Sequence, residues 1–295
     1  MLEHLNDTPR PPSRVVVIGA AGFVGNAIAA RAERDGAETV RIGRGEVDLL
    51  APGAADRLAG LLKDGDSIVA ASAIAPCKNL GQLQDNLRLT AALVEAIARV
   101  DAAHVVNIGS DAVFIDQDTP LTEASPKAPD SYHGVMHLAR EVAFKADVKA
   151  PLAIVRPTLL YGAGDPHNGY GPNQFRRKAN AGTPISLFGN GEERRDHVLV
   201  DDVAELAWRV LRHRSTGSLN IATGTITSFR DIANMAVRLS GRQVAIETTP
   251  RRGPMPHNGY RAFDPAATAR AFADFTYTSL QAGMTQAQNQ EFPHG

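Results

Sequence analysis

The stretch Arg14-Val15-Val16-Val17-Ile18-Gly19-Ala20-Ala21-Gly22-Phe23-Val24-Gly25 decides how the rest of this chain is interpreted. Its β-branched run predicts a strand that is buried on both faces, and residues 26–35 continue as an amphipathic helix. Gly19 permits a tight turn, Gly22 lets the backbone approach a pyrophosphate, and Gly25 lets the helix pack closely against the strand. The N–H groups at the start of the helix, beside Phe23 and Val24, can then bind the phosphates. This context favours a dinucleotide site over an ordinary strand-to-helix turn, which is the alternative.

Composition excludes several classes of protein. The chain has 295 residues, and its 31 basic and 32 acidic side chains give a net charge of −1. No overall charge therefore attracts it to nucleic acid or to an anionic membrane. The single cysteine, Cys77, excludes an internal disulfide and fits a reducing compartment. No apolar run reaches the roughly 18–20 residues that span a bilayer, so we expect a soluble, cytoplasmic protein without a membrane or nucleic-acid partner.

The order of the patterns predicts an α/β fold. Apolar strand patterns alternate with helical ones, which indicates a parallel sheet covered by helices on both sides. The predicted strands after the first are residues 38–43, 67–72, 104–109, 152–156 and 218–222, and the longest helices are 80–100 and 132–145. Residues 1–13 are polar and proline-rich, and we expect them to be a disordered leader. Regions rich in Gly, Pro, Asn and Arg fall outside the alternation and predict a smaller substrate lobe.

The end of the strand at residues 38–43 bears on the choice of coenzyme. An acidic residue there would bind a ribose 2′-hydroxyl, whereas Gly43 lies between Arg41 and Arg44, which can bind a 2′-phosphate. This favours NADP over NAD, unless the two arginines are only solvated surface charges. Further coenzyme contacts are expected from Asp48 and Leu49 at the adenine edge and from the small residues Ala70, Ala71 and Ser72.

Two hydroxyl groups form the candidate catalytic pair. Ser110 follows the strand at residues 104–109, and Tyr132 begins the next helix. Ser110 would hold a substrate oxygen while Tyr132 exchanges its proton with that oxygen.

Several motifs in one order resemble the extended short-chain dehydrogenase/reductase family, whose members are NAD(P)-dependent nucleotide-sugar epimerases, dehydratases and reductases. The matching positions are Gly19-x-x-Gly22-x-x-Gly25, Asn86, Ser110, Tyr132, residues 156–162 and residues 194–203. The resemblance implies a Rossmann-type doubly wound sheet, residues 14–160 plus about 197–225, with a smaller C-terminal substrate lobe, about 161–196 and 226–295. It also implies that Asn86 and Pro157 contact the coenzyme and that Ser110 and Tyr132 are catalytic.

One family position differs in this chain. The family has a lysine four residues after the tyrosine, where it lowers the tyrosine pKa, and this chain has Met136. His133 and His137 lie about 100° and 140° around the helix from Tyr132, so we expect neither to replace the lysine. Asp111 matches the acid of the family's dehydratases, but Ala112 stands where their base would be. Asp111 is therefore an auxiliary acid at most, and carbonyl reduction or epimerisation is favoured.

The resemblance extends to the substrate lobe. It implies that Asn173, Arg195 and the second arginine site at Arg251 and Arg252, of which Arg252 is the chosen candidate, bind a nucleotide diphosphate. Solvated surface charge is the alternative for each arginine. Asp165 and His167 lack a third ligand, so no metal site is expected. The helices 80–100 and 132–145 build a homodimer in this family, and we expect one here. Two functions remain open: an NAD(P)-dependent enzyme acting on a nucleotide-activated sugar, or a catalytically silent NAD(P)-binding regulator.

Overall fold

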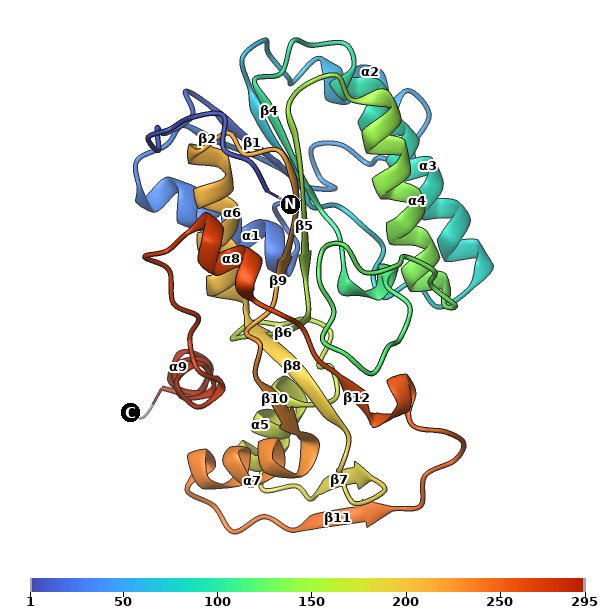
Figure 1. The fold of residues 1–295 in the computed structure, drawn as a ribbon, viewed down its shortest axis with the longest axis vertical. Helices are drawn as coiled ribbons and strands as arrows, with labels where there is room; N and C mark the ends of the chain where they lie inside the picture. Colours follow the sequence, from blue (N-terminus) through green and yellow to red (C-terminus); the bar gives the residue numbers. More distant parts are fainter. Residues whose placement is uncertain (1, 294–295) are drawn as a thin grey trace.

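The β-branched run after Arg14 forms β1 (Val15–Ile18), and all four of its side chains are buried. In the computed structural model, which describes residues 2–293, β1 lies inside a six-stranded parallel sheet with the order β2-β1-β3-β4-β5-β9 (Figure 1). The other strands are β2 (Thr39–Ile42), β3 (Ser67–Ala70), β4 (His104–Ile108), β5 (Leu152–Pro157) and β9 (Gly217–Ile221). The predicted α/β class is confirmed.

Helices cover both faces of this sheet because alternate residues of each strand point to opposite sides. Val15 and Val17 pack with α1 (Phe23–Arg34) and α6 (Val200–Arg212). Val16 and Ile18 pack on the opposite side, toward α2 (Ala54–Ala59), α3 (Leu80–Ile97) and α4 (Tyr132–Asp147). Figure 1 shows α3 and α4 side by side along one edge of the molecule.

A second, smaller domain lies beyond the carboxyl ends of these strands (Figure 1). Its strand β8 (Arg194–Leu199) pairs with β6 (Leu159–Tyr161), β10 (Ile226–Ser228) and β12 (Tyr260–Arg261). A separate pair joins β7 (Ile185–Phe188) to β11 (Ile246–Thr249). The helices of this domain are α5 (Pro172–Asn180), α7 (Phe229–Ser240) and α9 (Leu280–Glu291). A short 3₁₀ turn, η2 (Pro256–Gly259), precedes β12, and another, η1 (Asp111–Val113), follows β4 of the large domain.

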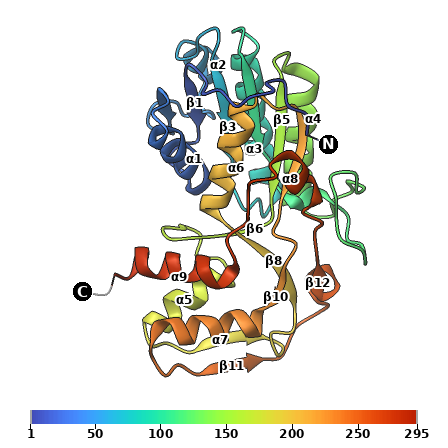
Figure 2. The ribbon, with the colours of Figure 1, turned by 60° about the vertical axis from the view of Figure 1, so that its left-hand side comes forward.

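The predicted boundary of the second domain needs one correction. Helix α8 (Ala266–Ala271) packs on β9, and Ala267 and Phe272 belong to the apolar core of the large domain. Figure 2 shows α8 beside the large domain, whereas α9 lies over the second domain. The chain after residue 226 is therefore shared between both domains, because apolar side chains of residues 267–277 complete the core next to α6.

The expectation of a disordered leader was also wrong for the residues described. Glu3 pairs with Thr216 through two backbone hydrogen bonds of 2.9 and 2.7 Å. The ring of His4 stacks on His213 and bonds Ser215 and the carbonyl of Ala271. The composition of the segment did not predict these pairings, because the partners lie more than 200 residues further along the sequence.

Candidate active site

A cavity of about 880 Å³ lies between the two domains, at the carboxyl ends of the large sheet. Nine of the residues predicted to form the site line it: Gly22, Phe23, Val24, Gly25, Ala71, Ser110, Asp111, Pro157 and Arg195. The sheet edge brings them together because parallel strands all end on the same side.

The glycine turn has the geometry that a bound pyrophosphate requires. Gly19 has a φ of +96°, and a Cβ added there would lie 2.6 Å from the backbone nitrogen of Ser72. A Cβ on Gly25 would lie 2.2 Å from the carbonyl oxygen of Gly19, so the helix can approach the strand only with glycine there. No side chain among the described residues caps α1, which leaves its first N–H groups available to an anion. These residues fit an adenine dinucleotide.

Other predicted coenzyme residues shape this groove from behind. Asn86 is buried, and its amide bonds both backbone groups of Ile74, at 2.9 and 3.0 Å. It thereby holds the segment after β3 that lines the cavity. The carbonyls of Ala70 and Ser72 accept hydrogen bonds from the buried Arg140, each of 3.0 Å. Asn86, Ala70 and Ser72 therefore hold the wall of the groove in position.

The residues expected at the adenosine end lie outside the cavity. Arg41 forms hydrogen bonds of 2.7 and 2.8 Å with Glu33, which lower the pKa of that carboxyl group. Arg44 pairs with Asp48 at 3.3 Å. Leu49 is buried in the core beneath the sheet end.

A carboxylate that the sequence interpretation did not single out lies at the same end. Glu46 Oε2 accepts a hydrogen bond of 2.7 Å from the N–H of Gly43. Negative charge therefore lies beside the end of β2, where a 2′-phosphate was expected.

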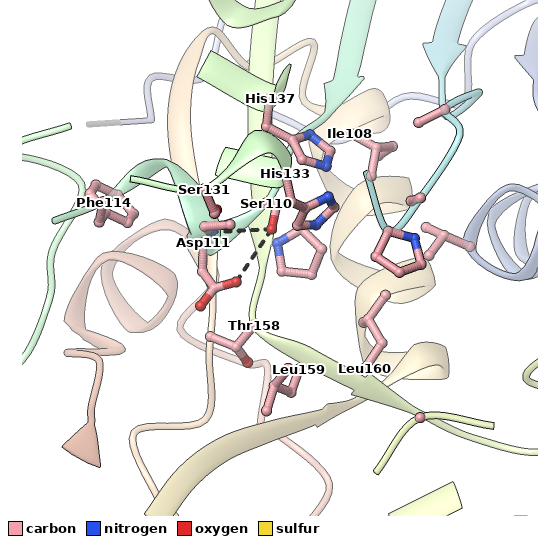
Figure 3. Close-up of a pocket in the computed structure, with 18 of the residues that line it drawn as sticks. Ile108, Ser110, Asp111, Phe114, Ser131, His133, His137, Thr158, Leu159 and Leu160 are labelled. Atoms are coloured by element: carbon pink, nitrogen blue, oxygen red, sulfur yellow. Dashed lines mark hydrogen bonds between the residues drawn. The ribbon is translucent and has the colours of Figure 1, made fainter. Parts of the chain in front are cut away.

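Ser110 and Asp111 lie together at the end of β4, as predicted (Figure 3). The Ser110 hydroxyl caps η1 by accepting from Ala112 N–H and donates to Asp111 Oδ1 at 3.3 Å. Asp111 Oδ2 in turn accepts from Arg261 Nε at 3.1 Å. Because an arginine from the second domain holds this carboxylate as an acceptor, the structure does not favour the predicted role of Asp111 as an auxiliary acid.

The structure places the predicted tyrosine away from the cavity. Tyr132 is the first residue of α4, and it is 45% exposed on the outer surface. His133 and His137 line the cavity instead, and Figure 3 draws both rings among its lining residues, with His137 above His133 in this view. Met136 is buried. The two histidines are four residues apart, the spacing expected for tyrosine and lysine, so the expectation that neither histidine occupies that place was wrong.

Gly134 sets this orientation of the helix. A Cβ at Gly134 would lie 2.3 Å from the carbonyl oxygen of Ala112 and 2.5 Å from Cβ of Pro129. The first turn of α4 can therefore lie against the loop after β4 only with glycine on that face. His133 and His137 then point into the cavity and Tyr132 points outward. Gly134 is visible in the sequence, but its contact with Ala112 forms only in the folded protein, so the sequence alone does not give this orientation.

Burial disfavours the protonated, charged form of both histidines. Loss of solvent lowers the pKa of His133, and the carboxylate of Asp111 acts in the opposite direction. Burial, His133 and Arg140 all lower the pKa of His137 well below its usual value. The two rings meet edge to face at a centroid distance of 4.7 Å.

The substrate residues expected in the second domain are only partly brought to the cavity. Arg195 lines it, bonds the carbonyl of Pro256 at 2.6 Å and pairs with Glu193. Asn173 is buried away from it and bonds Asp165 and the N–H of Gly162.

Arg252 is exposed on a loop outside the cavity. Its neighbour Arg251 is the arginine that shares Glu193 with Arg195, through an ion pair of 3.2 Å. The structure therefore favours Arg251 over Arg252. Within residues 2–293, no group of three or more potential metal ligands is found.

The comparisons with known proteins agree with this architecture. A model of the NAD dependent epimerase/dehydratase family matches residues 15–222. The chain belongs to this family. The resemblance to extended short-chain dehydrogenases/reductases is thereby confirmed, and the coenzyme is NAD or NADP.

Individual relatives are distant but span most of the chain. A dTDP-4-dehydro-6-deoxy-D-allose reductase of Streptomyces bikiniensis is 25% identical, covering 81% of this chain and 84% of its own. A dTDP-6-deoxy-L-talose 4-dehydrogenase (NAD(P)(+)) of Kitasatospora kifunensis is 27% identical, and the match covers 81% of this chain and 83% of the relative. The structure of a Thermus thermophilus UDP-glucose 4-epimerase in complex with NAD superimposes with a TM-score of 0.81, 19% identity and coverage of 94% and 98%. The last likeness concerns the fold alone.

Proposed function

We propose that this protein is an NAD(P)-dependent oxidoreductase or epimerase that acts on a nucleotide-activated sugar. One observation carries the proposal: a single cavity joins the glycine turn, the strand end that bears Ser110, and Arg195 of the second domain. A coenzyme and a second anionic ligand can therefore meet at Ser110. The distant relatives named above act on dTDP-linked sugars, which supports the substrate class.

Each part of the cavity has a role in this reaction. When bound, the coenzyme supplies or accepts a hydride at a sugar carbon. Ser110 contacts the oxygen on that carbon. Its single proton, donated to Asp111 Oδ1 in this structure, turns to the substrate when that oxygen is a carbonyl. Arg261 fixes Asp111 and so ties the second domain to the reacting end.

The nucleotide diphosphate is assigned to the arginines of the second domain. Arg195 and Arg251 both contact the buried carboxylate of Glu193, which keeps two guanidinium groups close together. Guanidinium groups match the geometry of phosphate oxygens better than ammonium groups do. A catalytically silent protein would not need this arrangement, and nothing in the comparisons supports that alternative.

A binding panel tests the proposal without knowledge of the sugar. We expect NAD or NADP, and separately one of the nucleotide diphosphates UDP, dTDP and GDP, to raise the melting temperature of the purified protein. A ligand present at a hundred times its dissociation constant stabilises the fold by about 2.7 kcal/mol, which is readily measured. A protein that no coenzyme stabilises would contradict the proposal.

A homodimer is part of this proposal. Large apolar side chains are exposed along the outer faces of α3 and α4: Leu80, Leu87, Tyr132, Val135 and Val142. The two helices lie side by side (Figure 1), so these side chains form one face that a second copy can cover. Tyr132 thereby receives a role at the subunit interface in place of the catalytic one.

A further inference from the structure

We propose that His133, as a neutral imidazole with its proton on Nε2, donates that proton to the substrate oxygen, and that this makes the site a carbonyl-reducing one. The inference rests on the proposed function, because it names the proton donor and the direction of the same reaction. Three independent features of the structure carry it.

The first feature is position. His133 and Ser110 both line the cavity, and they approach it from two different elements, the first turn of α4 and the end of β4. Figure 3 labels both side chains among the residues that line the cavity. An oxygen held by Ser110 is therefore within reach of the His133 ring, whereas Tyr132 lies on the outer surface.

The second feature is the hydrogen bond that selects the tautomer. The backbone N–H of Cys77 donates to Nδ1 of His133 at 3.3 Å. A backbone N–H can only donate, so Nδ1 must present its lone pair. In a neutral imidazole the proton is then on Nε2, and a second proton on Nδ1 would disrupt this contact.

The third feature is the surrounding charge. The titratable groups that act on the pair are Asp111 from η1, His137 on the next turn of α4 and, for His137, Arg140. Asp111 already forms an ion pair with Arg261. Burial opposes a charged His133, and the Nδ1 atom of His137 has no hydrogen-bond partner among the described residues. His137 therefore packs behind His133 as a second neutral ring.

These features match the chemistry of a ketone better than that of an alcohol. A carbonyl oxygen is only an acceptor, so it can receive the Nε2–H bond directly, as neutral imidazoles are known to do. When the carbon takes up a hydride, the carbonyl π bond breaks and its oxygen becomes a basic alkoxide. The Nε2–H bond then breaks, the proton forms the new O–H bond, and water returns a proton to the imidazole.

The reverse reaction would need His133 to accept a proton from a sugar hydroxyl. With Nε2 already protonated, the ring would first have to become an imidazolate, or change tautomer and lose its bond with Cys77 N–H. The resting tautomer is therefore complementary to a bound ketone and not to a bound alcohol. It also explains why no cation is needed beside the donor, since there is no phenol pKa to lower.

The tautomer can be measured without any substrate. In protein labelled with ¹⁵N-histidine, the ring nitrogen shifts distinguish an Nε2–H tautomer, an Nδ1–H tautomer and an imidazolium. His133→Phe identifies the signals of His133. We expect the neutral Nε2–H form of His133 at pH 7 and above, with and without NAD. An Nδ1–H tautomer or an imidazolium at pH 7 would overturn the proposal, even if the binding panel had supported the proposed function.

Kinetics test the role in turnover, with a dTDP-linked 4-keto-6-deoxyhexose and NADH or NADPH as the probe. We expect His133→Phe to lower kcat by about 10²–10⁴-fold, the usual contribution of a positioned proton donor. His133→Gln, which keeps an N–H near Nε2, should lose less. Tyr132→Phe should stay within about twofold of the unmodified protein. Loss of turnover in Tyr132→Phe, or full turnover in His133→Phe, would contradict the assignment.

The pH profile separates a neutral donor from a charged one. We expect the rate of ketone reduction to change little between pH 7 and 9, because the neutral ring is the reacting form. A rate that falls about tenfold per pH unit above the pKa of an ordinary histidine would show that imidazolium is the donor and would overturn the proposal.

Discussion

Among single residues, Arg261 links the two domains at the site. It is 4% exposed, and its guanidinium bonds the side chain and carbonyl of Asp111, the side chain of Asp116, and the carbonyl of Phe114. It comes from β12 of the second domain, whereas its partners follow β4 of the large domain. One side chain thus couples the position of the second domain to the orientation of Asp111 and Ser110.

We expect the choice between NAD and NADP to depend on a single residue, Glu46. Glu46 holds a negative charge at the end of β2, and a 2′-phosphate there would be repelled. Arg41 is already paired with Glu33, so it offers little compensation. We expect Glu46→Gln to raise the affinity for NADP relative to NAD by about fivefold, which corresponds to about 1 kcal/mol. Thermal shifts with each coenzyme measure this ratio.

Glu38→Gln is the matched control for that experiment. It removes the same charge at the opposite end of β2, where Glu38 lies 3.5 Å from Arg14. An equal change in both variants would mean that Glu46 does not contact the 2′ position.

His104 should make the fold sensitive to acid. Its ring is fully buried at the start of β4, its Nε2 donates to the carbonyl of Ser215 at 2.7 Å, and burial lowers its pKa from 6.5 to about 4. The unfolded chain therefore binds a proton that the native chain does not bind as the pH falls from 6.5 to about 4. The contribution of His104 is fully present above pH 6.5 and should decline by up to about 3 kcal/mol across this window.

Urea unfolding at a series of pH values tests this. His104→Gln keeps a donor for Ser215 but does not titrate, so its stability should fall less steeply between pH 6.5 and 4. Buried His197, with a pKa of about 3, remains and accounts for part of the slope that is left. Identical slopes for the variant and the unmodified protein would contradict the assignment.

At the scale of elements, the first turn of α4 determines which side chains enter the cavity. We expect Gly134→Ala to destabilise the protein by about 1–3 kcal/mol, because its Cβ would lie 2.3 Å from the backbone oxygen of Ala112. The displaced turn should also shift the ¹⁵N signals of His133. Thermal unfolding and the labelled-histidine spectrum measure both effects.

Gly81→Ala provides the comparison. Gly81 also lies in a first helical turn, that of α3, and its Cβ would meet only Asn79 Oδ1 at 3.4 Å. This variant should be neutral or slightly stabilised, because alanine favours a helix by about 1 kcal/mol over glycine. If both variants behaved alike, helix propensity and not the contact with Ala112 would explain the glycine.

The elements themselves could be predicted from sequence because their signals are local. The run Val15–Ile18 and the glycines after it specify a strand, a turn and a helix whatever surrounds them. The orientation of α4 could not be read in that way. Tyrosine and histidine both suit proton transfer, and the contact that selects between them joins Gly134 to Ala112, residues that meet only in the folded protein.

Long-range contacts also account for the other differences. The amides of Asn86 and Asn173 have the residue type of ligand-binding groups, yet backbone groups of Ile74 and Gly162 take their hydrogen bonds. Arg251 and Arg252 are adjacent in the sequence. Only the position of Glu193 in the fold shows that Arg251, and not Arg252, lies beside Arg195. Patterns along the chain do not contain these distances.

At the scale of the whole molecule, the exposed face of α3 and α4 should determine the oligomeric state. We expect the chain, with a mass of 31.4 kDa, to sediment as a dimer. Glu substituted at Leu87 or Val142 should shift it toward the monomer, because a buried charge without a partner costs several kcal/mol. Leu61→Glu is the control, since Leu61 is 40% exposed outside α3 and α4. A monomeric unmodified protein would contradict the proposed interface.

Within residues 2–293, the described helices include none that is long and apolar enough to cross a membrane.

The path of the chain between the two domains has a mechanical consequence. The backbone crosses from one domain to the other near residues 158, 199, 222–225, 262–265 and 272–279, and β8 continues into α6 without an intervening loop. Neither domain can be separated from the other by breaking the chain at one point. Because several short segments connect the domains, they oppose a large rotation of one domain relative to the other. We therefore expect the two domains to move little relative to each other and to unfold in one transition.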